Sequence, residues 1–548
     1  MSKSIVRCFA ALVFTAVCVP AFADVKLPEI FATNMVVQQE MPVSVWGWAD
    51  ADEEITASFD GQSVKTVTGK DGKWSLKLQA LKANAKPQTF TVRGKNEIKL
   101  ENVLIGEVWL CSGQSNMEWP MTHSAEYQEA LKTVDNPKIR LFQVARALNA
   151  SPQDSLSATW KMCNAENIPK FSAVGYYFGQ KLAADLDVPV GLINSSWGGT
   201  RIEPWTTPEG FNSVLALKSI SDDIAAHDVN SPAYRKLVEE TLKKYRDWLE
   251  TNEKLYLSTS AENTTRNAAQ RARNLVTRRN NAAPTRSAVP LQRITPPPAF
   301  PLNPYSRNQD PTVLYNTMVN PFAGLAIRGA IWYQGESNNG EGALYAEKMK
   351  ALINGWRKTF NPELGFYWVQ IAPFDYGGQR KEQLPELQVA QSSVEKFYSY
   401  ERVGQAVIND LVSNIKDIHP PKKLAVGNRL ALLALNRTYG KKDVVCASPE
   451  FDKIKIENST VALTFRSANE LKTRDGKAPT WFEVAGADGI YHKADAVIEG
   501  TTIKLTSPDV PKPYAARFAW DQIAEPNVEN EAGLPLGPFK AGEVPAPK

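Results

Sequence analysis

The sequence has almost no net charge, because its 63 lysine and arginine residues nearly balance its 59 aspartate and glutamate residues. For 548 residues, a formal charge of +4 is too small to create the broad positive field that draws proteins onto nucleic acid or anionic membranes. We therefore expect no nucleic-acid partner. Recognition of a ligand must come from a local site.

Residues that hold metals and phosphates are also scarce. Histidine occurs only four times. The sequence contains no His-x-x-x-His or Cys-x-x-Cys pair, and it lacks both common glycine-rich phosphate loops. It therefore predicts no metal site and no cofactor.

Long hydrophobic runs are missing except at the N-terminus. There Lys3 and Arg7 precede the apolar run Cys8–Pro20, and Ala21-Phe-Ala23 has the small-x-small pattern of a cleavage site. The run is shorter than the ~20 apolar residues that a membrane-spanning helix needs. We interpret residues 1–23 as a signal peptide, and we expect a periplasmic or secreted protein with no membrane association after cleavage.

Cysteine is rare as well, with five in the chain. Loss of residues 1–23 would leave Cys111, Cys163 and Cys446, an odd number that allows one disulfide and requires at least one free thiol. Cys111 lies in an apolar strand and is expected to be an unreactive core residue.

The chain is long enough for about two to four domains. Short β-type runs broken by turns at Asp60-Gly61 and Asp71-Gly72 predict a small antiparallel β-sandwich over residues 24–102. Strands that alternate with helices predict a mostly parallel sheet, flanked by helices, over residues 103–440. Alternation returns in residues 441–548, which predicts a C-terminal β domain.

Within the α/β domain the periodicity locates the individual elements. Strands are expected at Val103–Cys111, Val190–Asn194, Ile327–Tyr333, Phe366–Ile371 and Val403–Ile408, and helices at Ala173–Leu186, Tyr345–Thr359 and Leu384–Phe397. Residues 230–307 fit neither pattern and are interpreted as an insertion. They begin with a charged helical run and include six arginines without an intervening acid. This basic run is either a solvated surface, the reading we favour, or a patch for an anionic glycan.

Three glycine-containing turns follow three of the expected strands, at Cys111–Pro120, Ser195–Trp205 and Trp332–Asn338. Ligands of open α/β sheets bind at the carboxyl ends of the strands, so turns at three such ends should converge on one crevice. Ser115 in the first turn is placed to act as a nucleophile, and the backbone N–H of Gly199 in the second could donate to an oxyanion. Ser115 could instead simply cap a helix.

A serine nucleophile needs a general base, and His419 is the best candidate. It follows an expected strand and loop and precedes a helix that starts near Lys422, which is where a returning partner of the serine would lie. In the alternative interpretation, Asp417 and His419 only cap that helix.

The motifs resemble a known family when they are taken together. They are Gly113-Gln-Ser-Asn-Met-Glu-Trp119, Ser196-Trp-Gly-Gly-Thr200 with Glu203-Pro-Trp205, Leu314-Tyr-Asn316, Trp332-Tyr-Gln-Gly-Glu-Ser-Asn338 and Asp417-Ile-His-Pro420. With Asn527 and Gly533-Leu-Pro535, they are similar to the bacterial sialate O-acetylesterase family of the SGNH hydrolases, from about Leu27 to Pro538.

The resemblance implies an α/β fold of the SGNH type and a Ser/His/Asp esterase that removes O-acetyl groups from sugars, with sialic acid as the family's substrate. Ser115 is then the nucleophile and His419 the base. Most SGNH enzymes carry the triad aspartate three residues before the histidine, where this chain has Lys416, so Asp417 and Glu336 both remain candidates for orienting His419. Thr317 replaces the glycine expected after Leu-Tyr-Asn.

Other residues receive expected roles from the same reading. The oxyanion would be held by the backbone N–H groups of Ser115 and Gly199 and by the side chain of Asn338. Substrate contacts are expected from Gln114, Trp119, Arg201, Trp205 and Gln334, with Trp119, Trp205 and Trp332 either sugar platforms or packing residues. Arg201 would bind the carboxylate of a sialic acid or, alternatively, hold Glu203 or a loop carbonyl.

The expected partner is thus an O-acetylated sugar or glycan. Two other functions remain open: an acetylesterase acting on plant polysaccharides such as xylan, and a non-catalytic glycan-binding protein built on an esterase scaffold. The sequence does not set the oligomeric state.

Overall fold

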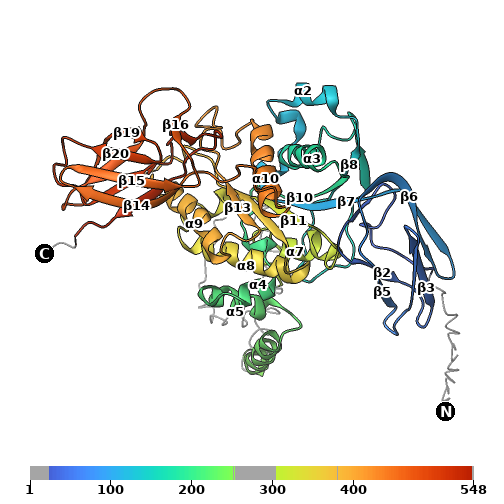
Figure 1. Cartoon of the computed structure of the whole chain (residues 1–548). Helices are drawn as coiled ribbons and strands as arrows, with labels where there is room; N and C mark the ends of the chain where they lie inside the picture. The colour runs from blue at the N-terminus through green and yellow to red at the C-terminus, as the bar shows by residue number, and fades with distance from the viewer. Residues whose placement is uncertain (1–23, 251, 253–303, 379, 546–548) are drawn as a thin grey trace, which may run out of the picture.

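The computed structural model describes residues 24–250, 252, 304–378 and 380–545. Three regions lie side by side along the molecule: an N-terminal β region, a central α/β region and a C-terminal β region (Figure 1). The predicted signal peptide and most of the basic run between residues 230 and 307 lie outside the described residues. No helix in the described part of the chain has the length and apolar character needed to cross a bilayer.

The central region is built on β7 (Glu97–Gly113), whose residues from Val103 onward are all buried. Its sheet has the order β13-β12-β11-β7-β10-β8-β9, and every neighbouring pair is parallel except β8 and β9. The other strands are β8 (Asn136–Gln143), β9 (Trp160–Cys163), β10 (Val190–Ser196), β11 (Gly329–Tyr333), β12 (Gly365–Val369) and β13 (Val403–Ala406). The predicted α/β class with a mostly parallel sheet is confirmed.

Helices cover both faces of this sheet, which explains why its strands read as continuous apolar runs. Side chains of α3 (Ala173–Leu186) and α10 (Lys423–Arg437) share one buried cluster with Trp109. Those of α8 (Leu344–Thr359) and α9 (Gln383–Phe397) share another with Leu110. Because Trp109 and Leu110 are successive strand residues, they point to opposite faces, and the two clusters are the two layers of the core.

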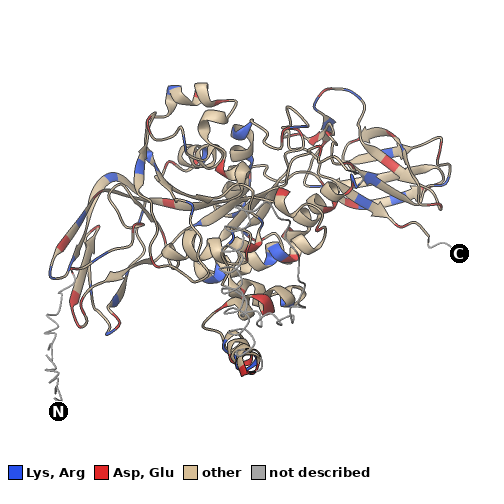
Figure 2. Cartoon of the chain, turned by 180° about the vertical axis from the view of Figure 1, so that it is seen from behind, with Lys and Arg blue, Asp and Glu red and all other residues tan. Residues whose placement is uncertain are grey.

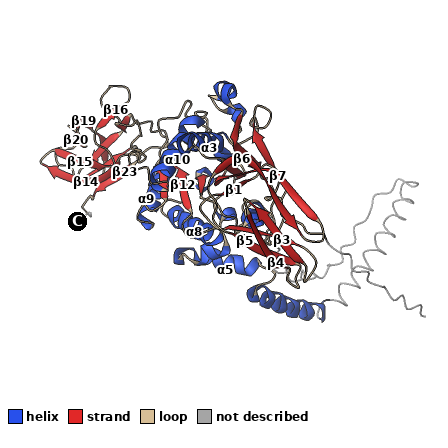
Figure 3. Ribbon diagram, turned by 45° about the vertical axis from the view of Figure 1, so that its right-hand side comes forward, coloured by secondary structure: helices blue, strands red, loops and turns tan. Residues whose placement is uncertain are grey.

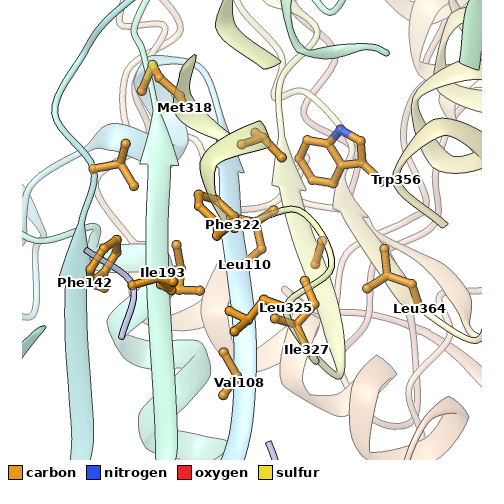
Figure 4. Close-up of a cluster of buried hydrophobic side chains, with 14 of the residues drawn as sticks. Val108, Leu110, Phe142, Ile193, Met318, Phe322, Leu325, Ile327, Trp356 and Leu364 are labelled. Atoms are coloured by element: carbon orange, nitrogen blue, oxygen red, sulfur yellow. The ribbon is translucent and has the colours of Figure 1, made fainter. Parts of the chain in front are cut away.

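Figure 4 shows the cluster on the second face, where the side chains of several strands meet. Val108 and Leu110 of β7 lie beside Ile193 of β10 and Phe142 of β8, and all four are at most 1% exposed. Burying such a side chain contributes roughly 1.5–3 kcal/mol, so this layer holds the strand ends in fixed positions.

The N-terminal region shares β7 with the central sheet. The first half of β7 pairs with β6 (Asn84–Arg93) and β1 (Val36–Gln38), and β6 pairs in turn with β3 (Glu54–Phe59), which pairs with β4 (Gln62–Val67). A separate two-stranded sheet joins β2 (Val43–Trp48) to β5 (Lys73–Leu78) (Figure 1). Figure 3 shows β5 beside β3 and β4 in the N-terminal region. The predicted boundary between residues 102 and 103 therefore lies inside one continuous strand.

The C-terminal region is a β structure with its own buried cluster around Val461, Phe482 and Phe518. One antiparallel sheet has the order β14-β15-β20-β19, a second has the order β18-β17-β21-β23, and β16 pairs with β22. The strands are β14 (Glu450–Glu457), β15 (Thr460–Arg466), β16 (Leu471–Thr473), β17 (Phe482–Ala485), β18 (Tyr491–Lys493), β19 (Asp495–Glu499), β20 (Thr502–Thr506), β21 (Ala515–Phe518), β22 (Val528–Asn530) and β23 (Phe539–Gly542).

Short helices make up most of the connections in the central region. They are α1 (Ser115–Glu118), α2 (Tyr127–Ala130), α4 (Pro208–Asn212), α5 (Lys218–His227) and α7 (Val313–Met318), with single 3₁₀ turns at Met121–His123, Leu131–Thr133, Glu203–Trp205, Leu215–Leu217, Asn320–Phe322 and Glu336–Asn338. Residues 232–250 form a further helix at the start of the predicted insertion.

The three cysteines of the described chain are all free thiols. Cys111 is fully buried in β7, as expected for a core residue, and burial raises its pKa far above the ordinary value. Burial also raises the pKa of Cys163 to about 12. Both thiols therefore stay protonated and unreactive at neutral pH.

Candidate active site

The three glycine turns meet because their strands are neighbours in the sheet. Gly113 at the end of β7 is in register with Ser196 of β10 on one side and with Tyr333 of β11 on the other. Parallel strands end at the same edge, so the turns that follow them are brought together. The convergence expected from the sequence is present.

Gly113 sets the path of the chain into the first turn. Its φ is +141°, and a Cβ at this position would lie 2.1 Å from the carbonyl oxygen of Tyr333. The next residue, Gln114, donates its backbone N–H to the same oxygen at 3.0 Å. The chain then turns into α1, whose first residue is the partly exposed Ser115.

Ser115 is hydrogen-bonded to His419. The Nε2 atom of His419 lies 2.8 Å from Ser115 Oγ, and the ring of Trp119 stacks on the imidazole at 4.6 Å between centroids. Burial, reinforced by the charge of Lys423, lowers the pKa of His419 below its ordinary value. The imidazole is therefore neutral at pH 7 and free to accept the serine proton.

Asp417 lies on the other side of the imidazole. Its Oδ1 accepts the backbone N–H of His419 at 2.9 Å and lies 3.7 Å from Nδ1 of the same residue. The carboxylate is about half exposed. It is therefore close enough to favour the tautomer with a proton on Nδ1, although the direct contact is longer than a hydrogen bond.

Glu336 takes part in a different arrangement. Its Oε1 accepts a 2.6 Å hydrogen bond from Asn116 Nδ2, which also donates to the carbonyl of Ile418 at 3.0 Å. The Oδ1 of Asn116 accepts from Lys423 Nζ at 2.6 Å. Among the described residues, no hydrogen bond joins Glu336 to His419.

We call Lys423, Asn116 and Glu336 the buried triplet. Burial lowers the pKa of Lys423 to about 7 and raises that of Glu336 above its ordinary value, so each group is easier to neutralise than in water. The triplet links the residue after Ser115 to the residue before His419. It therefore supports the nucleophile and the base together.

The sequence analysis did not single out Asn116 or Lys423. The signal was weak: Asn116 is one residue of a recognised motif, and Lys423 stands four residues after His419 in what reads as an ordinary amphipathic helix. Only the fold shows that a lysine without any exposed side-chain surface faces Asn116.

The second turn lies against the serine. A Cβ on Gly198 would be 3.2 Å from Ser115 Cβ, and the Gly198 N–H donates to Glu118 Oε2 at 2.8 Å. Gly199 follows with a φ of +74°. Within the described residues, the backbone N–H groups of Ser115 and Gly199 have no hydrogen-bond partner. They are two unused donors near the nucleophile.

Asn338 does not have the geometry expected of an oxyanion donor. Its Nδ2 donates to Glu203 Oε2 at 3.0 Å and to Glu341 Oε2 at 3.2 Å, and its Oδ1 accepts from the backbone N–H of Ile202. The side chain is 1% exposed. Both amide hydrogens are donated to carboxylates, so Asn338 has none left for an oxyanion. Its hydrogen bonds instead support the second turn.

Arg201 is held by two carboxylates rather than left free for a ligand. It forms ion pairs with Glu203 at 3.0 Å and with Glu341, and Lys348 pairs with the same two acids at 2.7 Å. Burial alone would raise the pKa of Glu203, but Lys348 and Arg201 outweigh it and lower the pKa to about 2. Two bases and two acids leave this cluster neutral.

Three residues expected to touch substrate are core residues instead. Gln334, Trp205 and Trp332 have no exposed surface. Gln334 Nε2 donates to Gln114 Oε1 at 3.1 Å, and the two tryptophan rings pack edge to face at 6.2 Å. The sheet is covered on both faces, so aromatic residues at its strand ends are buried. Burial supports the packing alternative for Trp205 and Trp332, and it excludes the substrate contacts expected from Trp205 and Gln334.

Trp119 and Gln114 remain beside the serine. Trp119 is partly exposed and donates its Nε1–H to the carbonyl of His123 at 3.0 Å, which fixes the ring against His419. Gln114 is 3% exposed and accepts the backbone N–H of Ser337 at 3.3 Å. Of the two, Trp119 offers the larger surface to a ligand.

No group of three or more histidine, cysteine, aspartate or glutamate residues in the described chain could hold a metal ion. The polar groups that do converge are a serine hydroxyl, a neutral imidazole and two backbone N–H donors without a partner, a set that can perform nucleophilic catalysis.

Comparisons with known proteins point the same way. A family model described as carbohydrate esterase, sialic acid-specific acetylesterase matches residues 105–253 and 302–431. The sialate O-acetylesterase of Rattus norvegicus is 27% identical over 499 residues, covering 83% of this chain and 81% of that protein. The sialate O-acetylesterase of Homo sapiens is 24% identical over 481 residues, covering 81% and 77%.

A solved structure extends the similarity to nearly the whole molecule. A carbohydrate acetylesterase from Xanthomonas citri superimposes with a TM-score of 0.74 at 30% sequence identity. The match covers 94% of this chain and 99% of that one. The similarity therefore includes the two β regions as well as the central sheet.

Proposed function

Because the chain belongs to the sialic acid-specific acetylesterase family of carbohydrate esterases, we propose that it removes O-acetyl groups from sialic acids through an acetyl-enzyme on Ser115. Family membership makes the protein a carboxylic ester hydrolase. The observation that carries the assignment of roles is the 2.8 Å contact between Ser115 Oγ and His419 Nε2.

In the first half-reaction, His419 Nε2 takes the proton of Ser115 as Oγ attacks the acetyl carbonyl carbon. The carbonyl π electrons move to oxygen, and the resulting oxyanion is held by the free N–H groups of Ser115 and Gly199. Collapse of this intermediate breaks the bond to the sugar oxygen. His419 then gives its proton to that oxygen, and the sugar leaves as an alcohol.

In the second half-reaction, water replaces the sugar. His419 removes a proton from the water as its oxygen attacks the acetyl-serine, and acetate leaves when Ser115 Oγ recovers its proton from the imidazolium. His419 becomes an imidazolium in each half-reaction, so a carboxylate near its Nδ1 stabilises the transition state of both. Asp417 is assigned this role because its Oδ1 is 3.7 Å from Nδ1.

The buried triplet has a positioning role in this mechanism. Glu336 is hydrogen-bonded to Asn116 and not to the imidazole, so it acts on His419 through the backbone of Ile418. We infer that it fixes the loop that carries the base.

The finer features of the fold and location are part of the same proposal. The strand-end turns support an SGNH-type hydrolase, and the two N-terminal sheets support a β-sandwich that abuts it. The basic, apolar and small-residue pattern of residues 1–23 supports export to the periplasm or the medium. The partner is then an O-acetylated glycan outside the cytoplasm.

One observation favours a second substrate class. Arg201, the cation best placed for the carboxylate of a sialic acid, is already paired with Glu203 and Glu341. A neutral acetylated polysaccharide such as xylan needs no such cation. The two classes therefore differ in what the crevice must supply.

Acetate release separates these possibilities. The purified protein and its Ser115→Ala variant are incubated with a panel of O-acetylated sialic acids and with acetylated xylan, and acetate is measured over time. Turnover of the sialic acids that is lost in Ser115→Ala supports the proposal. Acetate release from xylan alone would show that the substrate is an acetylated polysaccharide and not a sialic acid. If the unaltered protein releases acetate no faster than Ser115→Ala from every ester, the chain is a non-catalytic glycan-binding protein.

A further inference from the structure

A pocket of about 560 Å³ lies on the C-terminal β region, lined by residues of β17, β18, β19 and β21 and of the loops beside them. This volume falls in the range of small-molecule sites. Two tryptophans line it, the buried Trp520 and the exposed Trp481. The proposed esterase mechanism uses none of its residues.

Trp481 has an unusual backbone conformation. Its φ is +66°, a region that bulky residues rarely adopt and that costs of order 1–3 kcal/mol. The side chain is nonetheless 36% exposed, so core packing does not fully account for a large aromatic residue here. Strained residues are common at functional sites, so this conformation supports the inference of a function at Trp481.

The chain on both sides of Trp481 is held in place. Asn527 Oδ1 accepts from the backbone N–H of Thr480 at 3.0 Å and from its hydroxyl at 3.2 Å, and Asn527 Nδ2 donates to the carbonyl of Ala478 at 3.1 Å. The carbonyl of Trp481 accepts from the N–H of Ala519 at 3.0 Å. The backbone that carries the indole is therefore held in place before any ligand arrives, which reduces the entropy cost of binding.

The charged side chains around the pocket are mixed in sign. Acids and bases alternate along its lining, as Glu483, Lys493, Asp495, Arg517 and Asp521. With three acids and two bases, the pocket has no positive excess to attract an anion. Arg517 is already paired with Glu483 at 2.6 Å.

Two of these side chains are available to a ligand. Lys493 and Asp495 are exposed, and within the described residues neither side chain forms a hydrogen bond or an ion pair. Lys493 supplies donors and Asp495 supplies acceptors. The pocket therefore combines a flat aromatic surface with hydrogen-bonding groups of both kinds.

We propose that this pocket binds a neutral sugar unit of a glycan chain, separately from the esterase site. A pyranose ring has an apolar C–H face, which stacks on an aromatic side chain, and a rim of hydroxyls that donate and accept. Trp481 stacks on the apolar face of the ring, and Lys493 and Asp495 form hydrogen bonds with the hydroxyls of its rim. An anionic sugar is disfavoured by the acids, and a purely aliphatic ligand would leave both polar groups unsatisfied.

The pocket is connected to the loop that carries the proposed base. Gln522, next to Asp521 of the pocket, donates from Nε2 to Asp375 Oδ1 at 3.2 Å, and the Asp375 N–H donates to the carbonyl of Ile415 at 2.9 Å. Ile415 is four residues before His419. A glycan held in the pocket is thus bound to a part of the molecule that is hydrogen-bonded to the loop carrying His419.

Calorimetric titration of the full chain tests the pocket directly. The protein carries Ser115→Ala, so the result does not depend on esterase activity, and the probes are cellohexaose, xylohexaose and lacto-N-tetraose, all neutral. We expect at least one to bind, and Trp481→Ala and Asp495→Ala each to weaken its affinity roughly tenfold or more. Val497→Ala, on the same strand as Asp495 and 59% exposed but outside the pocket, is the matched control and should bind as before.

The proposal is overturned if none of the three neutral probes binds. It is also overturned if binding survives both pocket variants, because the sugar then occupies another site, or if only the anionic control 3′-sialyllactose binds. Melting temperature and circular dichroism verify that each variant is folded. If Trp481→Ala does not fold, Asp495→Ala decides, because its side chain is exposed and has no partner in the described structure.

Discussion

At the scale of single residues, the proposed chemistry rests on two side chains that are in contact although their positions are 304 residues apart. Ser115 stands at the end of β7, and His419 lies in the loop before α10. Neither group is reactive alone at neutral pH, because a serine hydroxyl is a weak nucleophile until a base removes its proton. The pair should therefore behave as one unit.

Removing either member of the pair should cost about the same. We expect Ser115→Ala and His419→Ala each to lower kcat for acetyl ester hydrolysis by ~10⁴-fold or more, and the double variant to be no slower than either single one. Initial rates with a chromogenic acetate check this. Losses that multiply in the double variant would contradict the assigned pair.

The orienting carboxylate is decided by two isosteric changes. Asp417→Asn removes the charge near Nδ1 of His419 and should lower kcat by orders of magnitude, whereas Glu336→Gln keeps a hydrogen-bond acceptor toward Asn116 and should cost less. The comparison of kcat on one chromogenic ester checks the ranking. The reverse ranking would make Glu336 the orienter.

The pH profile gives a further check at the residue scale, because two neighbours act on His419 in opposite directions. Burial and Lys423 lower its pKa, and Asp417 raises it. The base is active when neutral, so kcat/KM should rise with pH through an apparent pKa below the ordinary ~6.5. Lys423→Met removes a nearby positive charge and should move that limb to higher pH, while Asp417→Asn should move it to lower pH. If both variants moved the limb in the same direction, Lys423 and Asp417 would not have opposite effects on the pKa of His419.

At the scale of elements, the sheet determines where the turns meet. The registers of β10, β7 and β11 place Ser196, Gly113 and Tyr333 side by side, and all the glycine turns begin there. Short elements then carry the side chains: α1 begins with Ser115, and α10 begins with Lys423. Ser115 is thus placed by a strand end, whereas Asp417 and His419 lie in the loop of residues 407–422 between β13 and α10.

Replacing Gly113 tests the importance of this junction. A Cβ there would lie 2.1 Å from the Tyr333 carbonyl oxygen, so Gly113→Ala must separate β7 from β11 and should cost more than about 3 kcal/mol of unfolding free energy. Gly324→Ala is the matched control, because Gly324 also has a positive φ, of +82°, but has open space around its Cβ position and should cost only about 1 kcal/mol. Urea unfolding of both variants measures the difference. Equal losses would show that backbone conformation, and not the close approach, is what matters at Gly113.

Much of this architecture could be predicted from periodicity, and the failures have a physical pattern. The helix Ala173–Leu186 was predicted with its observed bounds, and strands β10 to β13 were predicted to within two residues at each end. Strand β7 was predicted to begin at Val103 but begins at Glu97, because its first half belongs to the N-terminal sheet. Strands β8 and β9 were missed. The strand β8 contains Pro137 and Arg140, which weaken an alternating or apolar pattern, and it is completed by tertiary pairing with β10.

The candidate site could be predicted only in part, because burial is not a local property. Tryptophan and glutamine residues near glycine turns look alike in sequence, yet Trp119 is partly exposed while Trp205 and Gln334 are fully buried. Lys423 shows the opposite failure, since a lysine at the start of a helix is normally solvated. Its burial and its hydrogen bond to Asn116 depend on where the fold places the first residue of α10, which no spacing rule encodes.

At the scale of the whole molecule, three regions are joined by shared structure rather than by flexible linkers. The strand β7 continues from the N-terminal sheets into the central one, and the C-terminal region is tied to it by hydrogen bonds such as that from Asn409 Nδ2 to the carbonyl of Leu536, at 2.8 Å. These contacts join the C-terminal region, which carries the proposed sugar pocket, directly to the central region.

The charge distribution over the molecule makes a final prediction. Lysine and arginine are interspersed with aspartate and glutamate along the chain (Figure 2), and the cluster around Arg201 is neutral because its two bases face two acids. An anionic O-acetylated sialic acid should therefore gain little from long-range attraction. We expect kcat/KM for the sialic acid to change by no more than about twofold between 50 and 500 mM NaCl, and kcat/KM for a neutral chromogenic acetate to change equally little.

Arg201→Ala should impair the hydrolysis of both substrates in parallel, because it loosens the support of the second turn. A steep salt dependence confined to the sialic acid, with a raised KM for it alone in Arg201→Ala, would instead show that Arg201 binds the substrate carboxylate.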